Sequence, residues 1–348
     1  MSMSKYILAS QIDAVVDDIG ADLGASSSIL ANQVLRWIRD ISPGGEPAAH
    51  FLHVRMFPIL RLPDFVVESL AVAPDDAFHR SLISSTVDGY YYIRLIDDLV
   101  DGDRDLDLER SILPIAGYFV SEFLRGYQKY FPADHEFWPV LRRLWIASAA
   151  ATAEDAMQRS IGFSEFERVS SRKYSAAGIP VAATCHHFGR ADLVPAWLEL
   201  VDGLGRWSQM VDDILDWHQD SGLGRATYFL AEGERRKPHG ESIEEWILRE
   251  GCDWGFNLLG EWMHRLQESA ARLGSRSLVE YLALRSSWAV EQHATLRNGL
   301  ADLARLAEIL SRAAPAGMSC GAGTTISMGR CSETTTMSKP IERRTYGR

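Results

Sequence analysis

Cysteine is scarce in this chain of 348 residues. The four cysteines form neither a CxxC pair nor the spacing of a zinc site, and two of them, Cys320 and Cys331, lie near the C-terminus. This pattern excludes a disulfide framework and a cysteine-rich zinc module. It favours a protein with reduced thiols in an intracellular compartment.

Long apolar runs and an excess of positive charge are also missing. No uninterrupted apolar run reaches about eighteen residues, so we expect no membrane span. The N-terminal stretch MSMSKYILASQIDAVVDDIG lacks the basic start and the apolar core of a signal peptide. The net charge of −11 argues against a general binder of nucleic acid or anionic membranes. We therefore expect a cytoplasmic protein with no nucleic-acid partner and no stable membrane insertion.

Strand signals are rare, whereas apolar residues at helical spacing are common. The apolar fraction of 46% is enough for a sizeable core. Four stretches predict amphipathic or buried helices: SQIDAVVDDIGADL, SSILANQVLRWIRDI, FWPVLRRLWIASAAATAEDAM and SLVEYLALRSSWAVEQHATLRNGLADLARLAEIL. Between the predicted helices stand breakers that contain Pro or Gly, at 43–45, 63–64, 132, 178–180, 195 and 237–240. The sequence predicts one all-α domain over residues 1–312.

The composition changes after Ser311. Residues 313–348 are dominated by Gly, Ser and Thr and hold few large apolar side chains. Such a segment buries too little apolar surface to offset the entropy lost on ordering. We expect a disordered C-terminal tail.

Two acidic clusters stand inside otherwise apolar, helix-like stretches. Their members are Asp97, Asp98 and Asp101 in YYIRLIDDLVDGD, and Asp212, Asp213, Asp216 and Asp220 in GRWSQMVDDILDWHQD. Helical residues four apart share a face, so Asp212, Asp216 and Asp220 point the same way. Carboxylates arranged like this repel one another unless a cation lies among them. One such cluster could be a solvated helix end, but two after apolar helices favour a hard divalent metal.

Magnesium fits such clusters because it prefers oxygen ligands and is usually held by one or two carboxylates plus substrate phosphates. Two acidic helices that face one cavity could hold several ions, with a diphosphate completing their coordination. Metal ions that share the leaving-group charge make ionisation of a carbon–oxygen bond feasible.

A diphosphate also needs direct hydrogen-bond donors. Arg225 follows two glycines in SGLGRATY, where backbone N–H groups could approach phosphate, although such a segment is often only a loop. Arg172 and Lys173 lie just before the breaker at 178–180 and are either a phosphate-binding pair or a solvated pair. Gln209 shares the face of the second cluster and could position water or substrate. Arg94, four residues before Asp98, could simply pair with that carboxylate.

With these motifs the chain resembles the class I isoprenoid synthase superfamily, which comprises trans-prenyl diphosphate synthases and class I terpene cyclases. The stretch QMVDDILD at 209–216, followed by GRATY at 224–228, is similar to the prenyl synthase pattern Q-x-x-D-D-x-x-D with a later G-K-x-T; Arg225 replaces the lysine. The resemblance implies a single-domain helical bundle around a central active-site cavity. It also implies a linear prenyl diphosphate substrate, about three Mg²⁺ ions that Mn²⁺ could replace, and a homodimer as a candidate assembly.

The resemblance implies roles for particular residues. Metal ligands would be Asp97, Asp98, Asp101, Asp212, Asp213, Asp216 and Asp220. Contacts to the diphosphate or its surroundings would come from Arg172, Lys173, Gln209, Arg225 and Tyr228. Among these, Asp97, Asp212, Arg172 and Arg225 are the residues expected to drive ionisation.

The chain also departs from the elongating enzymes of the superfamily. At 44–47 it has Gly-Gly-Glu-Pro where those enzymes carry a G-G-K-x-x-R, and at 102–105 it has Gly-Asp-Arg-Asp where they carry R-R-G. Both changes remove positive charge from the second diphosphate site. They favour a terpene synthase that ionises one substrate, C15 or C20, and then cyclises or rearranges the cation.

Three other functions stay open. The first is a chain-elongating prenyltransferase, and the second is a non-catalytic helical binding protein. The third, a di-iron carboxylate bundle, needs two Glu-x-x-His motifs, and only EWMH at 261–264 is present.

Several aromatic and late basic residues are weaker candidates. Tyrosines at 90–92 could limit substrate length, while Trp207, Trp217 and Trp288 could either stabilise carbocations or pack in the core. Terpene cyclases carry a late Arg-Tyr pair, for which the sequence offers only the candidates Arg285, His293 and Arg297.

Overall fold

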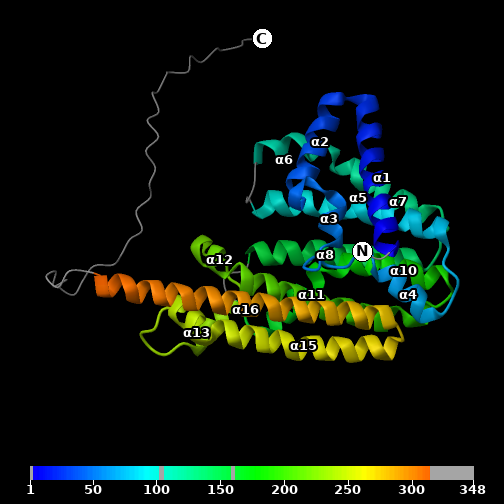
Figure 1. Ribbon diagram of the computed structural model, residues 1–348. Helices are drawn as coiled ribbons and strands as arrows, with labels where there is room; N and C mark the ends of the chain where they lie inside the picture. Colours follow the sequence, from blue (N-terminus) through cyan, green and yellow to red (C-terminus); the bar gives the residue numbers. More distant parts are fainter. Residues whose placement is uncertain (1–2, 102–105, 158–160, 314–348) are drawn as a thin grey trace, which may run out of the picture. The chain divides into compact units, whose positions relative to one another are not determined.

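The computed structural model describes residues 3–101, 106–157 and 161–313. All regular elements in these residues are helices, which confirms the predicted all-α class (Figure 1). The α-helices are α1 (Met3–Ser26), α2 (Ser28–Asp40), α3 (Pro47–Leu52), α4 (Leu62–Leu70), α5 (Asp76–Asp101), α6 (Leu106–Ile112), α7 (Ala116–Gln128), α8 (Phe137–Met157), α9 (Phe163–Lys173), α10 (Gly178–His187), α11 (Val194–Leu215), α12 (Trp217–Leu223), α13 (Tyr228–Arg236), α14 (Ile243–Trp246), α15 (Cys252–Leu273) and α16 (Arg276–Ala313). Shorter turns are η1 (Pro43–Gly45), η2 (Leu113–Ile115), η3 (Ser175–Ala177), η4 (Ala191–Leu193) and the π-helical η5 (Ile247–Gly251).

The internal contacts of the chain divide it into two units, Met1–Asn298 and Gly299–Arg348. In the second unit the described residues, 299–313, are helical. From residue 314 onward the predicted tail lies outside the described residues. The features below all belong to the first unit.

The predicted helices are present. Helix α8 (Phe137–Met157) coincides with the predicted stretch, and α1 and α16 enclose theirs. Pro63 and Pro195 differ from their expected role, because they stand in the first turns of α4 and α11 rather than between helices. Proline suits a first turn, where its missing N–H would have had no helical partner.

Helix α2 shows why these segments fold as they do. Ser27 caps it by accepting a hydrogen bond from the Leu30 N–H at 3.3 Å. Its buried residues recur at helical spacing and include Trp37, whose ring lies 5.8 Å from that of Tyr91 and 6.4 Å from that of Phe119. This aromatic cluster joins α2 to α5 and α7. Each such ring buries on the order of 150–250 Å², so the cluster contributes several kcal/mol.

Helix α11 is enclosed by other helices on most of its length. It packs against α9, α10, α13 and α15 (Figure 1). Trp197 and Trp207 are fully buried on these sides, and the Trp207 indole N–H donates to the Leu259 carbonyl at 3.1 Å. The apolar packing fixes the position of α11 and leaves its acidic face available for a role other than packing.

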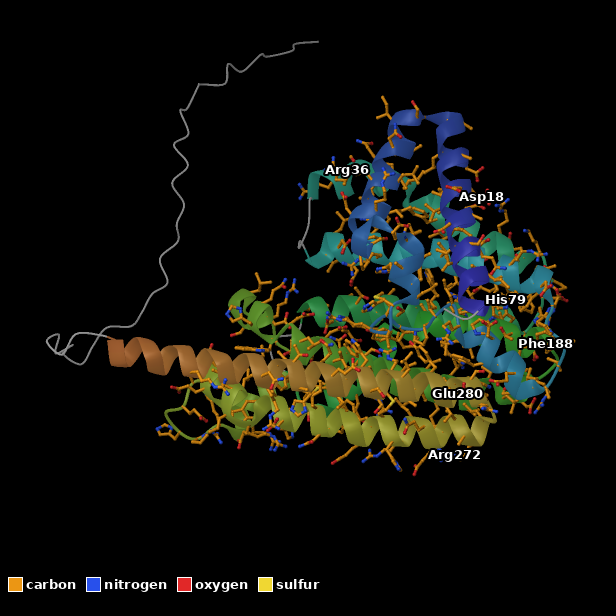
Figure 2. All side chains as sticks on the ribbon, viewed as in Figure 1. Asp18, Arg36, His79, Phe188, Arg272 and Glu280 are labelled. Atoms are coloured by element: carbon orange, nitrogen blue, oxygen red, sulfur yellow. The ribbon has the colours of Figure 1, made fainter. Side chains whose placement is uncertain are left out.

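Charged side chains lie on the surface of the first unit beside exposed apolar ones such as Ile29 and Met157. Arg36 and Arg272 lie at its outside (Figure 2). No helix in the described part of the chain combines the length and the apolar composition needed to cross a bilayer.

Helices α5 and α7 approach each other closely at Gly126. A Cβ atom added there would lie 1.9 Å from Ser85 Oγ and 3.0 Å from the Ser81 carbonyl oxygen. We expect Gly126→Ala to lower the free energy of unfolding by about 1–3 kcal/mol, because the helices must move apart. Urea denaturation followed by circular dichroism measures this change.

Gly117 offers a matched control in the same helix, since nothing lies within 4 Å of an added Cβ there. Gly117→Ala should keep or raise stability, by up to about 1 kcal/mol, through its better helix propensity. Equal stability of the two variants would contradict the close packing of α5 on α7.

Candidate active site

The junction of α11 and α12 carries the second acidic cluster. Asp216 ends α11, and its N–H donates to the Asp212 carbonyl at 2.8 Å. The Asp220 N–H donates in turn to the Asp216 carbonyl at 3.0 Å. The helical hydrogen-bond register therefore continues through the junction, and the three carboxylates stay on one side.

These carboxylates border a cavity of about 460 Å³. Its wall includes Val100 from α5 and Asp155 from α8 as well as residues of α9, α11 and the α12–α13 segment. The sequence-predicted residues that line it are Lys173, Gln209, Asp212, Asp213, Asp216, Asp220 and Arg225. One cavity thus gathers carboxylates, two cations and an amide from segments far apart in the sequence.

Asp213 is the most buried carboxyl on α11, with 4% of its surface exposed. Gln209 Nε2 donates to its Oδ1 at 2.9 Å. Burial raises the pKa of Asp213 to about 7, with the charges of Asp212 and Asp220 acting in the same direction and the Gln209 hydrogen bond opposing them. A cation placed in the cavity would lower this pKa again.

Arg55 is one of the site residues that sequence reasoning missed. Its Nη2 lies 2.9 Å from Asp212 Oδ1 and 2.9 Å from Asp216 Oδ2, and its Nε donates to Asp212 Oδ1 at 3.3 Å. The guanidinium therefore bridges the two carboxylates where a metal cation was expected. Arg55 stands in the irregular segment between α3 and α4, where no periodic pattern shows which helix a side chain faces.

Arg285 on α16 holds the segment that carries Arg55. It is fully buried, and it donates to the carbonyl oxygens of Arg55 at 3.1 Å and Met56 at 3.2 Å, and to Ser208 Oγ at 3.3 Å. Its guanidinium also lies 4.6 Å from the Trp207 ring centre. Arg285 therefore ties the Arg55 segment to α11 from beneath the cavity. His293 and Arg297 instead contact Asp253, at 2.6 and 3.7 Å.

The first acidic cluster is arranged differently. Asp98 is buried on α5 and pairs with Arg94 at 2.5 Å, the local contact that their spacing predicts. Asp97 is half-buried, and neither residue lines the 460 Å³ cavity. The Asp101 side chain lies outside the described residues. The first cluster thus has its own ion pair, between Asp98 and Arg94.

Tyr174 is affected by the charges of both acidic clusters. Its ring stacks on Phe57 with the ring centres 4.8 Å apart. Burial raises the pKa of Tyr174 well above its usual range, and the charges of Asp212 and Asp97 act in the same direction. The charges of both acidic clusters therefore act on the Tyr174 hydroxyl.

The basic pair on α9 is split between two environments. Lys173 lines the cavity and forms an ion pair with Asp155 of α8. Arg172 points to Glu154, 3.8 Å away, and does not line the cavity. Asp155 was not predicted, although it stands in the last turn of a predicted helix, because an acidic residue near a helix end has no distinguishing pattern.

The α12–α13 segment places Arg225 at the cavity. Gly224 ends α12 with a φ of 68°, a left-handed conformation that glycine adopts without strain. Arg225 Nη1 lies 3.7 Å from Asp220 Oδ1. Thr227 caps α13. Tyr228 does not line the cavity but packs on Phe166, which does, with ring centres 4.8 Å apart.

A smaller apolar cavity of about 160 Å³ lies between α5 and α8. Val100 lines both cavities. Tyr92 and Trp145 line the apolar cavity and stack with ring centres 5.4 Å apart. Tyr92 precedes Val100 by two helical turns, so the apolar space reaches roughly 12 Å along α5 from the polar cavity.

Within the described residues, no group of three or more Asp, Glu, His or Cys side chains is arranged to hold a metal ion. The guanidinium of Arg55 stands between Asp212 and Asp216. The donors are nonetheless all oxygens, and Mg²⁺ needs only one or two carboxylates when phosphate and water complete its shell. The residue types therefore fit a hard divalent cation, provided that Arg55 moves.

The chain matches no protein-family model, and no curated protein sequence matches it. It resembles the crystal structure of a polyprenyl synthase from Caulobacter crescentus CB15, complexed with calcium and isoprenyl diphosphate, over 79% of this chain and 97% of that one, with 17% identity and a TM-score of 0.55. A looser match to T. brucei FPPS in complex with 2-(2,5-dichlorobenzo[b]thiophen-3-yl)acetic acid covers 84% of this chain and 99% of that one, with 14% identity and a TM-score of 0.44. The first match confirms the predicted isoprenoid synthase-like fold.

The Arg55 bridge generates a prediction about metal. Arg55→Ala leaves Asp212 and Asp216 without their cation, so we expect the free energy of unfolding in metal-free buffer to fall by roughly 1–2 kcal/mol. Added Mg²⁺ should then raise the melting temperature of the variant more than that of the wild type, because no guanidinium competes for the carboxylates. Thermal unfolding with EDTA and with Mg²⁺ measures both effects.

Arg36→Ala is the control, since it breaks the exposed Arg36–Asp40 pair of α2. It should change stability by less than about 0.5 kcal/mol and leave the magnesium response unaltered. If Mg²⁺ stabilises the wild type and Arg55→Ala equally, Arg55 does not occupy the metal position.

Proposed function

We propose that this protein is a metal-dependent enzyme that ionises a linear prenyl diphosphate. The observation that carries the proposal is the row of Asp212, Asp216 and Asp220, which borders a polar cavity that also holds Lys173 and Arg225. This arrangement suits a strongly anionic group that binds together with divalent cations. The fold match supports it, because that polyprenyl synthase was crystallised with calcium and isoprenyl diphosphate.

The charged residues of the site have two roles, one for each sign of charge. Asp212, Asp216 and Asp220, together with Asp97 from outside the cavity wall, would hold Mg²⁺, which supplies the Lewis acidity that stabilises the diphosphate as it leaves. Lys173 and Arg225 would donate hydrogen bonds to the diphosphate oxygens. Arg55, displaced from its carboxylates, carries a third positive charge into the same space. These positive charges favour a reaction that begins with departure of the diphosphate over one that begins with protonation of the substrate.

The apolar cavity supplies the place for the prenyl chain. It shares Val100 with the polar cavity, and the stacked rings of Tyr92 and Trp145 line it farther along α5. An allylic carbon near Val100 would then face the carboxylates while its hydrocarbon chain runs along α5. Aromatic and aliphatic walls exclude water, which would otherwise capture the carbocation.

The carbocation has two candidate fates. The first is transfer to a second isoprenoid diphosphate, which the match to a polyprenyl synthase favours. The absence of a positive charge at residues 44–47 is evidence against transfer. Arg55, in the segment between α3 and α4, nevertheless supplies a guanidinium. The second fate is cyclisation or rearrangement, which Glu46 at the expected lysine position favours.

Incubation with C10, C15 and C20 prenyl diphosphates and Mg²⁺, with and without isopentenyl diphosphate, separates these fates. Transfer produces a longer prenyl diphosphate only when isopentenyl diphosphate is present. Cyclisation releases diphosphate and a hydrocarbon or alcohol without it. Absence of diphosphate release under every condition contradicts the proposal and leaves a non-catalytic helical protein.

Removal of single carboxylates tests the metal role. Asp212→Ala should lower the rate of Mg²⁺-dependent diphosphate release by at least about 100-fold, because it removes a cation-holding group from the centre of the cavity. Asp97→Ala should lower it by a smaller factor, since Asp97 lies outside the cavity wall. Diphosphate release is measured in a coupled colorimetric assay.

Asp202→Asn is the matched control, because Asp202 lies on the same helix α11 but does not line the cavity. It should retain wild-type turnover, and all three variants should keep their melting temperatures within a few degrees. Wild-type turnover in Asp212→Ala would overturn the assignment of the cavity.

The floor of the apolar cavity should control chain length. Trp145→Ala removes the indole that stacks on Tyr92, so the enzyme should accept or form a prenyl chain at least one isoprene unit longer. Trp138→Ala, on the same helix but with its indole bonded to the Pro132 carbonyl at 2.8 Å, should leave chain length unchanged. Mass spectrometry of the products distinguishes these outcomes. An unchanged product length in Trp145→Ala would place the chain elsewhere.

A further inference from the structure

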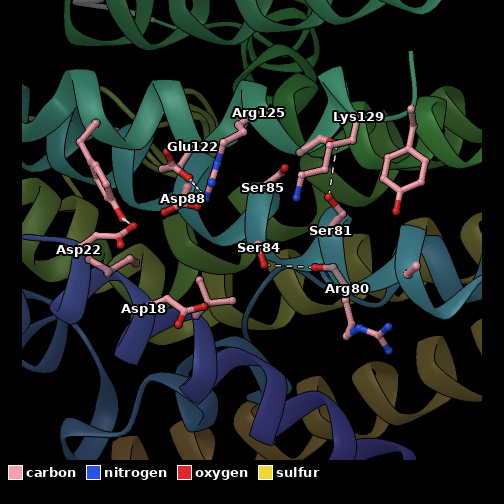
Figure 3. A pocket seen from close by; sticks show the side chains of 16 residues that line it. Asp18, Asp22, Arg80, Ser81, Ser84, Ser85, Asp88, Glu122, Arg125 and Lys129 are labelled. Carbon is pink, nitrogen blue, oxygen red and sulfur yellow. Dashed lines mark hydrogen bonds and ion pairs between the residues drawn. The ribbon is translucent and has the colours of Figure 1, made fainter. Parts of the chain in front are cut away.

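A second polar cavity lies between α1, α5 and α7, and no residue proposed above for catalysis lines it. It measures about 350 Å³, within the range of cavities that bind small molecules. Figure 3 shows Asp22 and Asp88 toward one end, together with the Glu122–Arg125 pair, and Arg80 and Lys129 toward the other.

The acidic end contains a buried carboxyl with one oxygen that has no hydrogen-bond partner among the described residues. Asp88 is 4% exposed, and Ser85, one turn earlier on α5, is 1% exposed. Among the residues that the structure describes, neither Asp88 Oδ1 nor Ser85 Oγ has a hydrogen-bond partner. A buried polar group without a partner costs free energy, so both atoms favour a ligand that can form hydrogen bonds with them.

The protein's own cations do not neutralise this end. The nearest guanidinium, that of Arg125, is already paired with Glu122. Burial raises the pKa of Asp88 to about 8, and the negative charges of Glu122, Asp22 and Asp18 act in the same direction, outweighing Arg125. The acidic end therefore has more negative charge than the neighbouring residues compensate.

The basic end is two helical turns away. Arg80 precedes Asp88 by eight residues on α5, which is about 12 Å along the helix axis. The Ser81 hydroxyl of this end donates to the Gly126 carbonyl of α7 at 3.4 Å, and Lys129 follows Gly126 by three residues. Among the described residues, neither Arg80 nor Lys129 forms an ion pair. Ser84 and Ser85 stand between the two ends (Figure 3).

We propose that this cavity binds a small zwitterion that carries an ammonium group and a carboxylate or phosphate several bonds apart. The ammonium lies against Asp88 and Ser85, with Asp18 and Asp22 nearby. The anionic group lies between Arg80 and Lys129. A simple amine would leave the two cations unused, and a simple anion would leave Asp88 without a donor. A single ion in the middle would reach neither end.

Calorimetric titration of the full-length protein tests this inference with four probes. The zwitterions 6-aminohexanoate and 6-aminohexyl phosphate carry the two possible anions, and hexylamine and hexanoate carry one charge each. We expect at least one zwitterion to bind at millimolar concentration or below, and both single-charge probes to bind at least tenfold more weakly. No binding by either zwitterion, or equal binding by a single-charge probe, overturns the inference.

Variants at the two ends locate the bound ligand. Asp88→Asn and Lys129→Met should each weaken the zwitterion by at least tenfold, because each removes a charge-assisted hydrogen bond. Lys129 is exposed, so its variant reports on binding even if Asp88→Asn alters folding. Asp17→Asn, on α1 but outside the cavity, should bind as the wild type does. Unchanged affinity in Lys129→Met would contradict this position, whatever the result for prenyl diphosphate turnover.

Discussion

The guanidinium of Arg55 holds Asp212 and Asp216 at 2.9 Å each, and the candidate site depends on that contact. Without a cation, carboxylates at helical spacing repel one another across the end of α11. Arg55 comes from an irregular segment, so it could not hold its position alone. Arg285 provides the anchor by binding the carbonyls of that segment to α11 and α16. The site is thus organised by a protein cation where a metal cation is proposed.

This arrangement explains how a helix can carry so many acids and still pack. Trp197 and Trp207 bury the apolar sides of α11, and that packing offsets the cost of collecting negative charge on the remaining face. Asp213 shows the cost directly, since burial raises its pKa to about 7. A helix face that carries polar side chains although the rest of the helix packs in the apolar core is typical of a site selected for function rather than stability.

Much of the fold follows from sequence, because helical spacing, caps and prolines act locally. The 137–157 helix and the shared side of Asp212, Asp216 and Asp220 are examples, as is the Arg94–Asp98 pair. Contacts between distant segments could not be predicted. Asp155 reaches the cavity wall, and Arg55 reaches the carboxylates of α11, through tertiary packing, which no local pattern encodes. Packing also explains why Arg172 and Tyr228, predicted as diphosphate contacts, do not line the cavity: Arg172 pairs with Glu154, and Tyr228 packs on Phe166.

The two polar cavities described above differ in kind. One is rich in carboxylates and adjoins an apolar space, which suits an anionic group on a hydrocarbon chain. The other separates its charges along α5 and α7, which suits a compact ligand of both signs. Their walls share no residue, so each site can be tested independently of the other.

A crystal structure of the protein with Mg²⁺ and inorganic diphosphate tests the central claim most directly. We predict that diphosphate lies in the 460 Å³ cavity, with metal ions between its oxygens and Asp212 and Asp216, and with Arg55 turned from those carboxylates to the diphosphate. A structure in which Arg55 still bridges Asp212 and Asp216, with no metal at the carboxylates, would contradict it.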